Sequence, residues 1–496
     1  MTYQQKVTRW TAAAAGLILS VTLSSGLAQA KPAATGPTVT LVAAQKNITI
    51  PRLGKFIYLD PGVYIASFGS QLRFDVSRAS YTKPLTLTQV IHVHGAGTEY
   101  RPLPASMLNG WKGLRRFLRV SVKNSAGKTI ASRILSICPN SYNTQRADPN
   151  APAKSPFPVL CEADPFPRGM VWGIQRGWAV DPIGGGFEFS GLRIKAKLGH
   201  YKVTVNIIEA WRRLLHISNA DASKVVRVHV VKQSSGCYIE CFAKHAPPRA
   251  KPLPNPASVP IMTNPPKADL PDLEPLPAWL IRVQNTHSST TYKASSAIDF
   301  GATVWVGGNA RLDVEGFRVN GSATMQAYQY FWHDGRVAGR ERVGTMGFAG
   351  YNHWHFKQFA QYRLLNAKKN LVLRSQKEGF CIGASDPINL LLPHASWNPG
   401  NLDISSDCGQ QSALWTQETL PVGWGDTYFQ TLPGQSFNIT NLPNGKYFIQ
   451  IIANPEHLLH ETNTHNDSSL REIILGGTKG HRTVKVPAYF GIDPEN

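Results

Sequence analysis

Eleven prolines stand between Pro247 and Pro277, and this density constrains the fold more than any other feature of the chain. Proline lacks a backbone N–H and has a fixed φ, so such a stretch excludes helix interiors and central strands and favours an extended, semi-rigid spacer. The chain of 496 residues also exceeds the usual size of one hydrophobic core. We therefore expect two domains, over residues 31–245 and 278–496, joined by a proline-rich linker over residues 246–277.

Both expected domains have the pattern of β-strands. In the first, short alternating or β-branched runs such as Leu118 to Val122 and Tyr201 to Ile208 are separated by Gly, Pro, Asn and Ser. The second continues in the same way, with runs such as Ala323 to Trp332 and Lys446 to Ile452. The sequence predicts an all-β protein, with an N-terminal β domain of unknown function and a C-terminal β-sandwich.

The first 30 residues have the pattern of a secretory signal peptide. Lys6 and Arg9 precede an apolar run from Ala12 to Leu23, and small residues follow at Ala28-Gln29-Ala30. The apolar run is shorter than the roughly 20 residues that a spanning helix needs, and no later segment is long and apolar enough. We expect a secreted protein, extracellular or periplasmic, without a transmembrane segment.

Six cysteines remain, at positions 138, 161, 237, 241, 381 and 408. In an exported chain, this even number and the three sequence-local pairs favour three disulfides. Cys237 and Cys241 have a spacing that could also indicate metal binding, but no nearby cysteine or histidine cluster supplies two further ligands.

The net charge of +21 predicts affinity for polyanions, such as an anionic cell-surface polymer. Lysine and arginine are spread along the chain, and no nucleic-acid module signature is present, which disfavours nucleic acid as a partner.

The segment Tyr351-Asn352-His353-Trp354-His355 is the strongest candidate for chemistry. In a strand, alternation places Tyr351, His353 and His355 on one face, and imidazole nitrogens suit copper or zinc. The same spacing also occurs in packed or solvated strands, and we interpret His92-Val93-His94 as structural because nothing near it carries chemistry.

Further motifs follow in a fixed order: Phe359-x-x-Tyr362-x-Leu364-Leu365, Lys377-x-x-Phe380-Cys381 and Gly423-x-x-Asp426-Thr427-Tyr428. Leu270-Pro-Asp-Leu273 precedes them, and Asn454-Pro455 with Glu461, Asn463 and Asn466 comes after them. Residues from about 270 to 478 thereby resemble the lysyl oxidase family. The small number of cysteines and the His-Trp-His centre resemble its bacterial members.

The resemblance implies a copper-dependent amine oxidase. In that family a histidine-rich strand binds copper, and a lysine joins a tyrosine to form the cofactor lysine tyrosylquinone. By motif position, the copper ligands would be His353 and His355, and the cofactor residues Lys377 and Tyr428. Asp426 is a candidate proton-transfer base because it lies two residues from Tyr428.

The sequence departs from the family at the first of three alternating histidines, where it has Tyr351. A tyrosinate oxygen could bind Cu(II), or a remote imidazole such as His333 could complete the site. An oxidase with cationic substrates also needs acidic groups at its mouth, for which Asp426 and Glu461 are candidates.

The sequence is therefore compatible with two functions. The first is a secreted copper-dependent oxidase of the protein-lysine 6-oxidase type, which converts peptidyl-lysine or small primary amines to aldehydes and releases hydrogen peroxide and ammonia. The alternative is a catalytically inactive cationic envelope- or matrix-binding protein with a relic lysyl oxidase-like domain.

Overall fold

The structure is a computed structural model that describes residues 36–93, 97–140, 144–148, 151–152, 154–161, 165–183, 191–232, 259–286, 295–318, 323–349, 353–375, 377, 379–398, 408, 415–432 and 434–489. The expected signal peptide, the pair Cys237 and Cys241, His94 and Tyr351 lie outside these residues. In the described part, no helix has the length and apolar character needed to cross a membrane.

Strands make up nearly all of the regular structure, so the predicted all-β class is confirmed. Among the described residues the helices are α1 (Glu209–Leu214) and the short 3-10 turns η1 (Ala105–Met107) and η3 (Lys267–Asp269). Alternation drives strand formation, as in β14 (Gly199–Ile207), where Tyr201, Val203 and Val205 point into the core and the residues between them do not.

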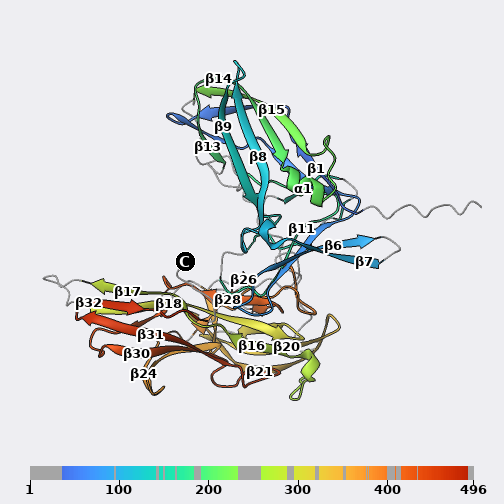
Figure 1. The fold of residues 1–496 in the computed structure, drawn as a ribbon. Coiled ribbons are helices and arrows are strands. Elements are labelled where there is room, and N and C mark those ends of the chain that lie inside the picture. The colour runs from blue at the N-terminus through green and yellow to red at the C-terminus, as the bar shows by residue number, and fades with distance from the viewer. Residues whose placement is uncertain are drawn as a thin grey trace, which may run out of the picture.

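The described strands before residue 233 form four sheets, in the upper part of Figure 1. They are β1 (Thr38–Ala43), β4 (Val63–Phe68), β12 (Trp178–Val180) and β10 (Thr144–Arg146); β11 (Gly169–Ile174), β5 (Leu72–Ser77), β6 (Thr86–Val93) and β7 (Gly97–Leu103); β13 (Leu192–Lys195) and β3 (Phe56–Leu59); and β2 (Asn47–Arg52), β15 (Ser223–Lys232), β14, β8 (Leu114–Asn124) and β9 (Thr129–Ile137).

The described strands after residue 258 form three sheets, in the lower part of Figure 1. They are β16 (Pro271–Pro275), β18 (Ser295–Gly308), β28 (Trp424–Tyr428) and β26 (Asp386–Pro387), with β17 (Trp279–Thr286) and β29 (Ser436–Asn438) also on β18; β25 (Gly379–Phe380), β22 (His353–Lys357), β21 (Arg336–Ala349), β20 (Thr324–His333), β19 (Leu312–Arg318) and β27 (Trp415–Leu420); and β24 (Leu371–Arg374), β23 (Ala360–Asn366), β30 (Gly445–Ala453), β31 (Ser468–Thr478) and β32 (His481–Lys485).

Part of the proline-rich segment is itself a strand. β16 begins and ends with a proline and pairs with β18 on one side, from Pro271 opposite Gly308 to Pro275 opposite Val304. Its position at the end of the sheet order explains why prolines are tolerated there, because an edge strand needs only one row of backbone donors.

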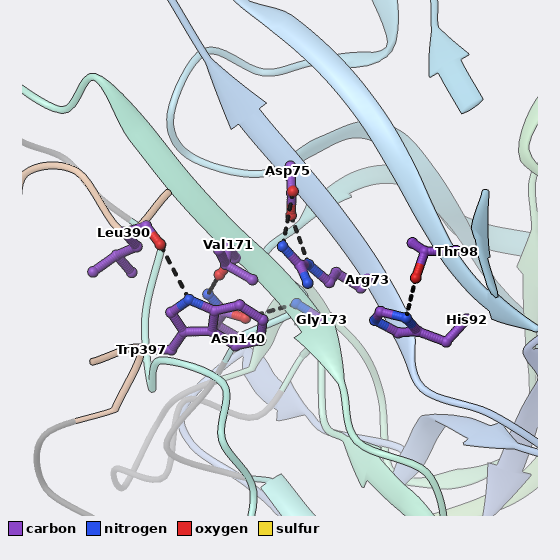
Figure 2. A network of polar contacts seen from close by, with 9 residues as sticks. All are labelled: Arg73, Asp75, His92, Thr98, Asn140, Val171, Gly173, Leu390 and Trp397. Carbon is purple, nitrogen blue, oxygen red and sulfur yellow. Dashed lines mark hydrogen bonds and ion pairs between the residues drawn. The ribbon is translucent and has the colours of Figure 1, made fainter. Parts of the chain in front are cut away.

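The two groups of sheets meet at Trp397, which follows β26. The Trp397 ring stacks on Phe157, with ring centroids 5.8 Å apart, and the Arg73 guanidinium lies 4.4 Å from the Trp397 ring centroid. The indole N–H donates to the carbonyl of Leu390 at 3.1 Å (Figure 2). Asn398 donates its side-chain amide to the carbonyl of Phe157 at 2.8 Å. Packing and hydrogen bonds therefore hold the two groups together.

Two of the three expected disulfides are present, Cys138–Cys161 and Cys381–Cys408. His92 donates to or accepts from Thr98 at 3.0 Å on the exposed face of β6 (Figure 2). This contact with a neighbouring strand agrees with a structural interpretation of His92.

Candidate active site

β22 carries the histidine motif. His353 and His355 alternate along this strand and share a face, and their ring centroids are 4.5 Å apart with the planes tilted by 53°. The residues between and after them, Trp354 and Phe356, are fully buried on the opposite face. The structure therefore brings the two imidazoles together, while Tyr351 lies outside the described residues.

The two imidazoles fit a copper site by the chemistry of their donors. Burial, followed by the charges of His353 and Lys377, lowers the pKa of His355 to about 4. His355 is therefore neutral at physiological pH, which is the form that binds a metal. Within the described ranges, no three His, Cys, Asp or Glu side chains gather in a metal-binding arrangement. The described residues thus offer two imidazoles at this position.

His333 cannot complete that set, because it lies at the other end of the sheet. His333 pairs with Arg336 at the first residue of β21, whereas His353 pairs with Ala349 at its last residue. At about 3.4 Å per residue, the length of β21 separates the two histidines by about 40 Å. His333 is instead hydrogen-bonded to Asp269 at 2.9 Å.

Lys377 and Tyr428 approach each other although 51 positions separate them in the chain. The Lys377 Nζ lies 4.4 Å from the centroid of the Tyr428 ring. The Tyr428 hydroxyl donates to the carbonyl of Cys381 at 3.1 Å, and Phe380 packs edge-on against the ring at 5.0 Å. The phenol is therefore oriented by two contacts while its ring faces the amine.

Local structure explains this approach. Tyr428 ends β28, where it pairs with Ala302 of β18. Lys377 lies between β24 and β25, and Gly434 packs directly on its backbone: a Cβ at position 434 would come within 3.0 Å of the Lys377 Cβ. A side chain at position 434 would require the Lys377 segment to shift by a few tenths of an ångström, and the φ of +85° is one that residues other than glycine rarely adopt.

Asp426 shares the strand β28 with Tyr428 and lies two residues before it, so both side chains point to the same face. Burial, and then the neighbouring Asp386, raises the pKa of Asp426 well above its ordinary value, while Lys377 opposes the shift. Burial also lowers the pKa of Lys377. Desolvation thus drives both groups toward their neutral forms.

The histidine strand is connected to the Lys377–Tyr428 pair by several contacts. Gly379 packs on His355, and a Cβ added at position 379 would lie only 2.9 Å from the Cβ of His355. The backbone N–H of Trp354 donates to the carbonyl of Cys408 at 2.9 Å, and Cys408 forms the disulfide with Cys381. One disulfide therefore contacts the histidine strand at one end and the Tyr428 hydroxyl at the other.

Two buried acids that no sequence motif indicates, Glu418 and Asp386, lie close to this site. Glu418 on β27 is fully buried, accepts a hydrogen bond from the Ile382 N–H at 3.1 Å, and contributes to a raised pKa of Tyr428. Asp386 accepts from the Ser385 hydroxyl at 2.7 Å and lies near Asp426. Neither belongs to a recognisable motif, and no signal in the sequence distinguishes them from exposed acids.

Glu461, the other candidate acid, belongs to a different cluster. Its carboxylate accepts hydrogen bonds from the Leu273 N–H at 3.2 Å and the Asn454 side-chain amide. Burial, and then the neighbouring Asp467, raises its pKa to about 8. Its hydrogen bonds are therefore with Leu273 of β16 and with Asn454, the residue that follows β30.

A comparison with protein families identifies the same region. Residues 348–483 match the family model for lysyl oxidase, a range that includes His353, His355, Lys377, Asp426 and Tyr428. No curated protein matches the chain. The C-terminal part of this chain contains a lysyl oxidase domain.

Proposed function

We propose that this chain is a secreted, copper-dependent amine oxidase that converts peptidyl-lysine or another primary amine to an aldehyde. The observation that carries the proposal is the 4.4 Å approach of the Lys377 amine to the Tyr428 ring. In the balanced reaction, one primary amine, one dioxygen and one water give one aldehyde, one hydrogen peroxide and one ammonia. The lysyl oxidase domain supports an oxidase of this general kind.

The residues present fit the cofactors of that chemistry. His353 and His355 would hold copper, with Tyr351 as a further donor, and Lys377 and Tyr428 would form lysine tyrosylquinone. Copper with dioxygen supplies the means to oxidise a phenol, and the quinone supplies a carbonyl that takes up an amine and its electrons.

The chain prepares its own lysine for bond formation. An amine forms a covalent bond only through the lone pair of its neutral form. Burial lowers the pKa of Lys377 and so increases the neutral fraction. The contacts of Tyr428 with Cys381 and Phe380 fix the ring plane, which supports reaction at one edge of the ring.

Asp426 would then move a proton. A carboxylate with a raised pKa is a stronger base than an exposed one and holds its proton at a higher pH. Its position on the same face as Tyr428 supports removal of the proton from the carbon next to the substrate nitrogen. Burial raises the pKa of the neighbouring Glu418 well above its ordinary value, so this acid is driven toward its neutral form and supplies no charge that would attract a cationic amine.

The proposal is tested by copper loading of the full chain and measurement of peroxide with a small primary amine and with a lysine-containing peptide. We expect amine-dependent peroxide, and a proteolytic fragment in which the Lys377 and Tyr428 peptides are covalently joined. Lys377→Arg and Tyr428→Phe should abolish both signals, while Lys368→Arg, which changes an exposed lysine, should retain them.

Activity without the joined peptide would contradict the proposed cofactor. Absence of both signals in a copper-loaded protein would favour the alternative function, a cationic surface-binding protein.

A further inference from the structure

The sheet β2-β15-β14-β8-β9 contains no aspartate or glutamate in any of its five strands. Its inner face is apolar: Val122, Val203 and Val226 stand opposite one another and are at most 1% exposed. The next residues along each strand point the other way, into solvent. This sheet lies at the end of the molecule away from β26 and β28 (Figure 1).

Three cations cross the outer face of this sheet in one row. Lys202 of β14 pairs with Lys123 of β8 on one side and with Arg227 of β15 on the other, and all three are exposed. We call these three residues the basic row. Adjacent strands are about 4.8 Å apart, and like charges directly opposite one another are unfavourable. Among the described residues, the ion pairs include none with Lys123, Lys202 or Arg227.

Two imidazoles border the basic row. His200 and His229, also directly opposite and exposed, stack with ring centroids 4.3 Å apart and planes within 13°. The β8–β9 turn forms a wall beside them through Ser125 and Gly127. Together with the basic row, His200, Ser125 and Gly127 line a depression of about 650 Å³, and His229 stands beside it in contact with His200.

We propose that this depression binds an acidic polysaccharide, with its charged groups aligned along the basic row. Charge complementarity carries the proposal, because a closely spaced series of anions would relieve the repulsion between three cations for which the described residues supply no ion-pair partner. The binding face is separate from the lysyl oxidase domain, so this inference does not depend on the oxidase activity.

The side chains of this face favour a polysaccharide over nucleic acid. Binding of single strands relies on aromatic side chains on which bases stack. The strands of this sheet contain two such residues, Phe117 and Tyr201, and both are buried beneath it. His200 and His229 stack on each other, so each covers one ring face of its neighbour.

The face also lacks the apolar anchors of a membrane-binding surface. Such surfaces insert Trp, Phe or Leu side chains below the headgroups. The exposed large apolar residues of these strands are Ile134, at 39% exposure, and Val225, at 44%. Two aliphatic side chains on different strands do not form a continuous insertion surface.

The test measures binding of the full chain to polygalacturonate, to vesicles of anionic and zwitterionic phospholipid, and to a single-stranded oligonucleotide, at matched ionic strength. We expect polygalacturonate to bind most tightly, and binding to weaken with salt. The variant Lys123→Gln/Lys202→Gln/Arg227→Gln should bind it at least about tenfold more weakly.

The matched control removes the same charge from the C-terminal half, through Lys368→Gln/Lys479→Gln/Lys485→Gln at three exposed lysines. This control should bind the polysaccharide nearly as well as the unmodified chain. Equal losses in the two triple variants would overturn the proposal, because net charge would then account for binding. Tighter binding to the vesicles or the oligonucleotide would overturn it in favour of that partner.

Discussion

Gly434 lies directly against the backbone of Lys377, with φ of +85° and with the Lys377 Cα and Cβ within 3.2 Å of the position that a Cβ would occupy. The residue that supports the candidate cofactor lysine is thus a glycine 57 positions further along the chain, with a backbone conformation that other residues rarely adopt.

Gly434→Ala should therefore slow formation of the Lys377–Tyr428 link. The methyl group would push the Lys377 backbone away, and the positive φ would cost roughly 1–2 kcal/mol of folding stability. Mass spectrometry of the joined peptide measures the effect. Gly335→Ala is the control, because it has φ of +75° and open space around the added Cβ. Equal amounts of joined peptide in the two variants would show that the contact with Lys377 is unimportant.

The disulfide Cys381–Cys408 should matter for the site and for stability. It closes 27 residues and Cys138–Cys161 closes 23, so removal of either by Cys→Ser should cost about 3.5 kcal/mol of unfolding free energy. Only the loss of Cys381–Cys408 should also reduce the amount of joined peptide, because its ends contact Tyr428 and Trp354. Denaturant unfolding and mass spectrometry separate the two effects.

Copper binding should depend on His355 and not on His333. His355→Ala removes a buried neutral donor and should weaken copper binding by at least the roughly 10- to 100-fold that loss of an outer-shell partner costs. His333→Ala should leave the affinity unchanged, since β21 separates His333 from the site. Metal titration of both variants provides the measurement, and equal affinities would refute the assignment of His355.

Glu274 should make folding stability decline with pH. Burial, and then Asp272, raises its pKa from 4.5 to about 7, against the attraction of Arg168. Below pH 4.5 the Glu274 carboxyl is protonated in both the folded and the unfolded protein. As the pH rises, the unfolded protein releases this proton first, so folding stability falls between pH 4.5 and about pH 7 and then stays at the lower value. Glu274→Gln should reduce the decline in unfolding free energy between about pH 5 and pH 8, whereas Glu456→Gln, at an exposed position, should not.

The strand pattern and the motif order could be predicted because they depend on local sequence. Alternation identified the β class, and the order of the Lys377 and Tyr428 motifs indicated the lysyl oxidase resemblance, which the family match confirms. The catalytic and ligand roles of the site residues stay predictions. Burial could not be predicted: Glu418 lies in Trp415-Thr-Gln-Glu-Thr-Leu420, where alternation does not reveal that both faces are covered. The sequence also allows His333 as a metal ligand, but His333 lies at the opposite end of β21 from His353.

Trp397, held between Phe157 and Arg73, has a consequence for how this protein would work on a surface. Since that contact joins the two groups of sheets, binding of the N-terminal sheet to a surface would fix the orientation of the Lys377–Tyr428 pair relative to that surface. Under the proposed oxidase function, only amines at a suitable distance from the anchored sheet would reach that pair, and peroxide would be released at the same distance.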